Sequence, residues 1–201
     1  MKLRRYFLLG CLLLALAMIA KGGYMQAKAH FAQFLIEQAW RKTLDDGEWH
    51  KPWSWADTHP IARLSFLDQA GGAADPLFIL AGASGRNLAF GPSAILTDNR
   101  LNQAGNTIIA AHRDTHFARL SMIQNGQLIA LQDSRAVERI YRVTQIEVVD
   151  EQDTSLMDSD ELQLTLVTCY PFESLTGQSR WRYVVIARPI TLSPAHEFSV
   201  R

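Results

Sequence analysis

The sequence has few cysteines and no excess charge of either sign. Only two cysteines, Cys11 and Cys169, occur in 201 residues, and one of them lies in an apolar N-terminal segment. This excludes a disulfide framework. The 20 basic and 20 acidic residues balance, so no global field steers the chain toward nucleic acid or anionic surfaces. Repeats and low-complexity tracts are also missing. With 48% apolar residues, the chain has enough for one packed domain plus an appendage.

The one long hydrophobic run stands at the N-terminus. Basic residues precede the apolar stretch Tyr6–Ala20, which continues past Lys21 to Met25. Such a basic start followed by an apolar run predicts a membrane anchor or signal over residues 1–25, with the rest of the chain outside the cytoplasm. The uninterrupted stretch is shorter than the ~20 residues of a full span, but a lysine near a helix end can snorkel.

Two processing signals compete with a retained anchor. Ala15-Leu16-Ala17 is similar to a signal-peptidase site, so cleavage of the segment stays open. Leu8-Leu9-Gly10-Cys11 is similar to a lipoprotein box. However, most of the apolar run follows Cys11, whereas a cleaved signal needs that run in front. We therefore expect Cys11 to be an ordinary membrane residue.

Residues 26–59 are predicted to form an amphipathic helix and a connector. From Ala27 to Leu44 apolar residues recur at helical spacing, and Asp45-Asp46-Gly47 predicts the end of the helix. The predicted apolar face consists of Phe31, Ala32, Leu35, Ile36, Ala39 and Trp40. Tryptophans 40, 53 and 55 in this region allow two interpretations: contact with the membrane interface, or packing on the domain.

Residues 60–201 are predicted to form a mainly β domain. Short β-type runs alternate with turn residues such as Gly91-Pro92 and Asn125-Gly126. The expected strands are Ile61–Phe66, Leu77–Leu80, Asn87–Phe90, Thr107–Ala111, Gln127–Leu131, Arg139–Val149, Leu162–Cys169 and Trp181–Ile190. A short helix is expected at Thr115–Ile123. This many short strands predicts a sandwich or a closed barrel.

Cys169 is a candidate nucleophile. It ends the strand-like run Leu164–Cys169 and is the only cysteine outside the apolar segment. A free thiol in an extracytoplasmic protein favours a reactive role, and the alternative is a small buried apolar residue. The attacking species is the thiolate, and an unperturbed thiol, with a pKa of about 8.5, is mostly protonated at neutral pH. A neighbouring imidazole can take that proton.

Three motifs resemble, in order, those of the sortase family of cysteine transpeptidases. They are Thr107-Ile-Ile-Ala-Ala-His112, Thr165-Leu-Val-Thr-Cys169 and Arg182-Tyr-Val-Val-Ile-Ala187. The stretches 111–117 and 168–172 are most similar to the sortases of Gram-negative bacteria. The resemblance implies a sortase-like closed β-barrel over 60–201 with short inserted helices, preceded by the membrane helix and the amphipathic helix.

The resemblance implies that Cys169, His112 and Arg182 form the catalytic set. His112 would act as general acid and base, and the guanidinium of Arg182 would stabilise the oxyanion. Arg180 shares strand parity with Arg182 only if the last strand already begins there, and we favour Arg182 because it opens the apolar run. His116, four residues after His112, is the competing base.

Further residues are expected around the substrate. The predicted substrate-binding residues are Thr168, His116 and Tyr170. Aromatic and apolar residues of the loop before the last strand, including Leu175, either shape a peptide groove or simply pack. Asp114 either orients the imidazole or caps the following short helix, and we favour the cap.

No metal and no organic cofactor is expected. His112 and His116 stand four residues apart as in a zinc helix, but Arg113 occupies the position where that motif requires glutamate. No further histidine or cysteine pattern supplies a third ligand. Some Gram-positive sortases bind calcium in a loop, and no acidic cluster here clearly matches it.

The resemblance implies a membrane-anchored transpeptidase that cleaves a C-terminal sorting signal similar to Leu-Pro-x-Thr-Gly. Its partners would be a protein carrying that signal, an amine or water as acceptor, and the membrane, with no nucleic acid. The family usually stays on the membrane, so we expect a single-pass protein of the inner membrane with a periplasmic catalytic domain. Two alternatives stay open: a cysteine endopeptidase using water, and a non-catalytic peptide-binding module. The module predicts loss of a catalytic position, and all three are present.

Overall fold

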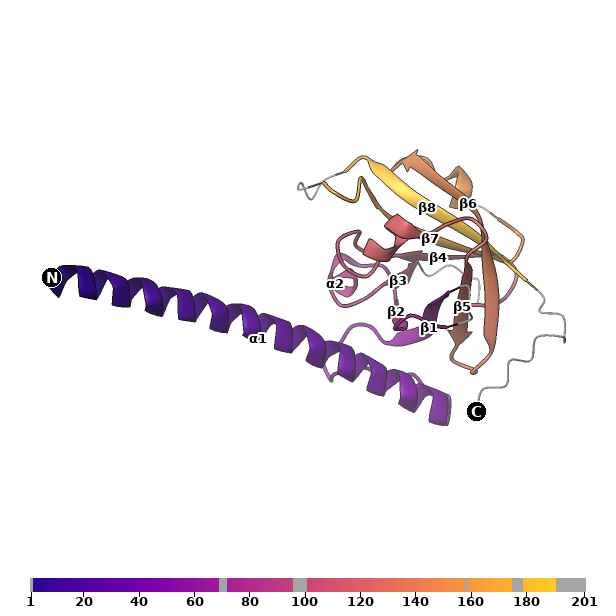
Figure 1. Ribbon diagram of the computed structural model, residues 1–201. Coiled ribbons are helices and arrows are strands. Elements are labelled where there is room, and N and C mark those ends of the chain that lie inside the picture. Colours follow the sequence, from indigo (N-terminus) through magenta and orange to yellow (C-terminus); the bar gives the residue numbers. More distant parts are fainter. Residues whose placement is uncertain (1, 69–71, 96–100, 158, 175–178, 191–201) are drawn as a thin grey trace.

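The computed structural model (Figure 1) describes residues 2–68, 72–95, 101–157, 159–174 and 179–190. Its longest element is α1, a continuous helix over Lys2–Asp46. The N-terminal part of α1 projects away from the β domain, and its C-terminal part lies along that domain (Figure 1). The predicted anchor and the predicted amphipathic helix are thus one helix. By length and composition α1 can cross a membrane, and its most apolar stretch is not buried.

One face of α1 holds the helix on the β domain. The buried residues of this face are Ala32, Ile36, Ala39, Trp40 and Thr43, which recur at the spacing of a single helical stripe. Phe31, also predicted to lie on the apolar face, remains 60% exposed. The helix ends as predicted, because Gly47 adopts φ 78° and its N–H donates to the Thr43 carbonyl at 2.9 Å.

Eight strands form a closed barrel, which confirms the predicted fold class. They are β1 (Pro60–Leu67), β2 (Leu77–Ala81), β3 (Ser93–Ile95), β4 (Asn106–Ala110), β5 (Leu128–Asp133), β6 (Glu138–Asp150), β7 (Gln163–Tyr170) and β8 (Trp181–Pro189). Their order around the barrel is β1-β2-β3-β4-β7-β8-β6-β5. The pairs β2–β3 and β4–β7 are parallel and the others are antiparallel. The crossover from β4 to β7 carries two short 3-10 helices, η1 (Ala118–Met122) and η2 (Ser155–Met157).

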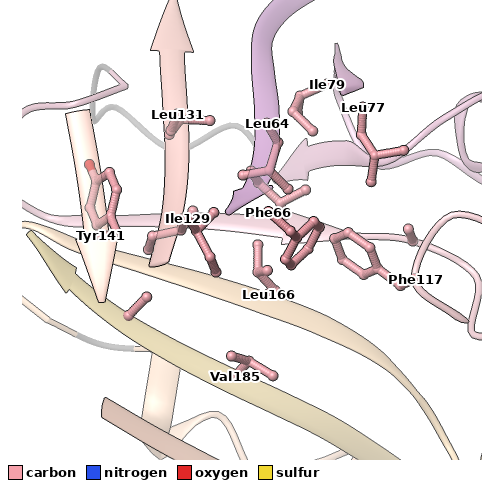
Figure 2. Close-up of a cluster of buried hydrophobic side chains, with 14 of the residues drawn as sticks. Leu64, Phe66, Leu77, Ile79, Phe117, Ile129, Leu131, Tyr141, Leu166 and Val185 are labelled. Atoms are coloured by element: carbon pink, nitrogen blue, oxygen red, sulfur yellow. The ribbon is translucent and has the colours of Figure 1, made fainter. Parts of the chain in front are cut away.

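The barrel interior is filled by apolar side chains contributed by all eight strands. In Figure 2, Leu64, Ile129 and Leu166 converge from different strands, and Phe117 closes the cluster from the turn before η1. Tyr141 is fully buried among them, and its hydroxyl donates to Asn102 Oδ1 at 2.9 Å. Burial raises the pKa of Tyr141 to about 12, so the phenol stays neutral in the core.

One predicted strand before β3 is wrong, and β3 itself was missed. The predicted strand Asn87–Phe90 is instead the helix α2 (Gly85–Leu88) followed by a turn, and β3 was not predicted. The alternation Asn-Leu-Ala-Phe imitates a strand, but Ser84 caps the helix by accepting a hydrogen bond from the Asn87 N–H at 3.2 Å. The Asn87 side chain is buried and donates to the carbonyls of Ala81 and Gly82. The predicted helix at Thr115–Ile123 is present in shorter form as η1.

Candidate active site

β7 lies between β4 and β8 and brings the three sequence motifs together. The parallel pairing with β4 sets Ala110 opposite Val167, and the antiparallel pairing with β8 sets Cys169 opposite Arg182. The Ala111 N–H donates to the Val167 carbonyl at 3.2 Å, which continues the pairing one residue past β4. His112, the next residue, therefore lies beside the end of β7, where Cys169 stands.

The predicted catalytic side chains share the outer face of the barrel. Because side chains alternate along a strand, Cys169 and Arg182 lie on the same side as a small apolar cluster that is separate from the core. This outer patch consists of Ile108, Val167, Val184 and Ile186. His112 follows β4 by two residues and comes directly after Ala111, whose N–H bonds to Val167 of β7. Cys169 is half-buried and His112 is exposed, so thiol and imidazole are both within reach of a peptide in solution.

Thr168 points the other way and links β7 to the end of β4. Its side chain is 3% exposed, and its hydroxyl donates to the Ala111 carbonyl at 2.7 Å. This bond joins the residue before Cys169 to the residue before His112. It therefore stabilises the spacing between the two backbones. A role for Thr168 in orienting substrate stays a prediction.

The guanidinium of Arg182 is held in a defined position. Its Nη2 donates to Glu151 Oε2 at 2.6 Å, and its Nη1 donates to the carbonyls of Ser179 at 2.6 Å and Trp181 at 3.1 Å. A guanidinium has five N–H donors, so these three bonds leave two for another acceptor. The side chain is 27% exposed. Arg182 can therefore keep its place and still donate to an oxyanion.

Arg180 lies in a different environment. It precedes β8, so strand alternation does not extend to it, and its side chain is 74% exposed. Its guanidinium pairs with Asp150 and lies 5.6 Å from the centre of the Trp181 ring. The Gln152 amide, followed by the Arg180 guanidinium, holds the pKa of Asp150 below its usual value. Of the two arginines, the register places Arg182 opposite Cys169.

His116 follows His112 within the same turn and is half-buried. Burial lowers its pKa, and the nearby charges of His112 and Arg119 lower it further. The predicted cap at Asp114 is wrong: the residue before η1 is Phe117, and it makes no side-chain capping bond. The Phe117 N–H donates to the His112 carbonyl at 3.1 Å, so the chain makes a full turn after His112 before η1 begins.

An aromatic cluster lies at the end of β7. The ring of Tyr170 lies parallel to that of Tyr183, with centroids 6.1 Å apart, and Phe172 meets Tyr183 edge-on at 5.1 Å. All three side chains are half-buried, so packing accounts for much of their surface. Leu175, predicted to line a groove in the same loop, lies outside the described residues.

Three residues near the site were not predicted from the sequence. Glu151 holds Arg182, and Leu156 of η2 packs against the outer patch. Arg113 is buried directly after His112, and its Nη2 donates to the Ser174 carbonyl at 3.2 Å. This bond ties the loop after His112 to the loop after Cys169. The sequence did contain a signal for Arg113, because it is a charged residue directly after the predicted base His112.

No metal-binding cluster is present in the described part of the chain. There, no three histidine, cysteine, aspartate or glutamate side chains gather closely enough to hold an ion.

Comparison with known proteins agrees with the geometry. Residues 74–190 match the family model of the sortase domain. Sortase D of Bacillus subtilis (strain 168) is 32% identical over 92 residues, which are 45% of this chain and 46% of that protein. The match thus spans about half the length of this relative.

Solved structures share the fold. Sortase A from Corynebacterium diphtheriae aligns with a TM-score of 0.58 and 24% identity over 70% of this chain and 65% of that one. The Clostridium perfringens sortase D5 transpeptidase aligns with a TM-score of 0.55 and 24% identity over 77% of this chain and 89% of that one. These relatives are Gram-positive, so the Gram-negative type stays a prediction. The match of the family model over most of the barrel shows that the chain belongs to the sortase family.

Proposed function

We propose that this sortase is a membrane-anchored cysteine transpeptidase that cleaves a C-terminal sorting signal similar to Leu-Pro-x-Thr-Gly. Membership of the family implies cysteine transpeptidase activity. The observation that carries the assignment of residues is the register of β7, which sets Cys169 opposite Arg182 and lets His112 follow directly beside it.

In the proposed reaction, His112 takes the thiol proton and Cys169 Sγ attacks the threonine carbonyl carbon. The C–S bond forms, the threonine–glycine C–N bond breaks, and His112 returns the proton to the departing amine. An amine then attacks the thioester and gives a proton to His112, so that a new C–N bond forms, the C–S bond breaks and the thiolate of Cys169 leaves and regains a proton from His112. Arg182 donates to the oxyanion in both steps, because two of its N–H groups are not used by the bonds to Glu151, Ser179 and Trp181.

The surroundings of Cys169 support a partly apolar peptide as substrate. The outer patch lies on the same face as Cys169, and the partly buried side chains of Leu156 and Val149 cover it. Leucine and proline of a sorting signal would pack against these covering side chains. Tyr170 and His116, both half-buried at the edges of the site, are the proposed substrate contacts.

The proposed location is the inner membrane of a Gram-negative cell, with the barrel in the periplasm. α1 is long and apolar enough to span a bilayer, and the basic residues at its start favour a cytoplasmic N-terminus. The barrel packs on the opposite end of the same helix, so it would lie on the other side of the membrane.

The test of the function is a covalent adduct on Cys169. Full-length protein in detergent, given a peptide containing Leu-Pro-x-Thr-Gly, should gain the mass of the peptide up to threonine on Cys169. An added amine should then appear in the product. Cys169→Ala should form no adduct and cleave nothing. Cleavage by that variant would overturn the enzymatic assignment, and hydrolysed product alone in the presence of amine would indicate an endopeptidase.

His112→Ala should slow acylation by about 10²–10⁴-fold, the usual contribution of a general acid or base. His116→Ala is the comparison variant and should slow acylation far less, because His116 is proposed to contact the substrate and not to transfer the proton. Single-turnover adduct formation compares the two variants. A larger loss at His116 would assign that residue as the base.

Arg182→Lys should lose about 10²–10³-fold in turnover although it keeps the charge, because an ammonium lacks the planar fork of N–H donors. Arg180→Lys should be nearly normal, since Arg180 precedes β8 and pairs with Asp150. Peptide cleavage rates decide between them. The opposite order would identify Arg180 as the oxyanion partner.

Residues 1–25 should hold the protein in the membrane without contributing to catalysis. Cell fractionation should therefore recover the full-length chain with the membranes, including after an alkaline carbonate wash. Recovery of a soluble mature form that lacks the first segment would instead show that Ala15-Leu16-Ala17 is cleaved as a signal.

A further inference from the structure

A large apolar cavity lies where α1 meets the β domain. It has a volume of about 520 Å³ and is lined by Lys28, Phe31 and Leu35 of α1 together with Trp53, Trp55 and Arg86. Trp53 contacts Phe90 edge-on with ring centroids 5.0 Å apart. This contact holds one wall of the cavity in place. Trp55, on the rim, is 82% exposed. Trp55 and Phe31, which is 60% exposed, thus both leave most of their aromatic surface open to solvent.

The cavity lies close to the predicted membrane surface. If residues 6–25 of α1 span the hydrocarbon layer, a rise of 1.5 Å per residue gives about 30 Å, the thickness of that layer. Lys28 and Phe31 then lie about 5–9 Å beyond its edge, which is the depth of the lipid headgroups. α1 is continuous over this region, and the buried face from Ala32 to Thr43 holds the barrel on it. The distance between cavity and bilayer is therefore set by the helix.

The chemistry of the rim matches a headgroup layer. Tryptophan is enriched at membrane interfaces because its ring is apolar and its N–H is polar. Arg86 pairs with Asp57 at 3.0 Å, so that pair adds no net charge, and exposed Lys28 supplies a cation for a lipid phosphate. The exposed aromatic surface also continues directly from the apolar surface of the span.

We propose that this aromatic cavity rests in the headgroup layer of the bilayer that α1 crosses, with Trp55 as its anchor and phospholipid as its occupant. This inference rests on the proposal that α1 is a membrane anchor, and it does not depend on the chemistry at Cys169. The contact would hold the barrel in one orientation on the membrane, in addition to the tether.

Tryptophan fluorescence in nanodiscs tests this directly. Full-length protein at one copy per disc is compared in discs of ordinary phospholipid and of phospholipid brominated near the ester ends of its acyl chains, because bromine quenches nearby indoles. Trp55→Phe should reduce the quenching by about twofold or more, as expected for an indole at the interface. Trp49→Phe is the matched control and should leave the quenching unchanged. Trp49 is also exposed, at 51%, but follows the far end of α1, about 30 Å from residue 25.

Equal effects of the two substitutions, or no quenching of Trp55, would overturn the proposal. Because each disc holds one copy, contact with a second copy of the chain cannot account for any change in tryptophan quenching. As a further check, Lys28→Glu should weaken the quenching more in discs of anionic lipid than in zwitterionic discs, and an equal response would contradict the phosphate contact. Peptide cleavage measured on the same samples in detergent reports the proposed function separately.

Discussion

The site depends on the hydrogen bonds that β7 makes to its two neighbours, of which β4 runs parallel to it and β8 runs antiparallel. Parallel pairing with β4 makes both strands end at the same edge of the sheet, so His112 and Cys169 come together although they are distant in sequence. Antiparallel pairing with β8 places the start of that strand, at Arg182, opposite the end of β7. A slip of one residue in either register would turn a proposed catalytic side chain to the other face of the sheet.

Closure of the barrel explains why the proposed catalytic residues lie outside it. The interior is packed with side chains from all eight strands, and a charged group placed there would lose its hydration without compensation. Side chains alternate between the two faces of each strand, so Leu166 and Val185 face the interior while Cys169 and Arg182 on the same strands face outward. The outward-facing guanidinium is still held, by Glu151 and two carbonyls. A positioned charge of this kind is what oxyanion stabilisation requires.

α1 would connect the proposed catalytic site with the membrane in a single element. The same helix supplies an apolar stretch long enough to span a bilayer and a buried face that holds the barrel. A continuous helix keeps its length, so in the proposed anchored state the barrel would stay at a fixed distance from the membrane, as it would not on an extended linker. The cavity at Lys28, Phe31 and Trp55 lies at the junction of these two functions.

The sequence by itself determined the elements that depend on local patterns. These are the apolar N-terminal run, the end of α1 at Asp-Asp-Gly, seven of the eight strands and the short helix of η1. Motif resemblance added the candidates Cys169, His112 and Arg182.

Only the tertiary structure decided what depends on contacts between distant segments. β3 has three residues and exists through its pairing with β2 and β4, and the position of Arg182 opposite Cys169 follows from the register of β7 with β8. The partner Glu151 and the loop bond of Arg113 were likewise invisible, because a sequence pattern records which face a side chain occupies and not which distant residue it meets.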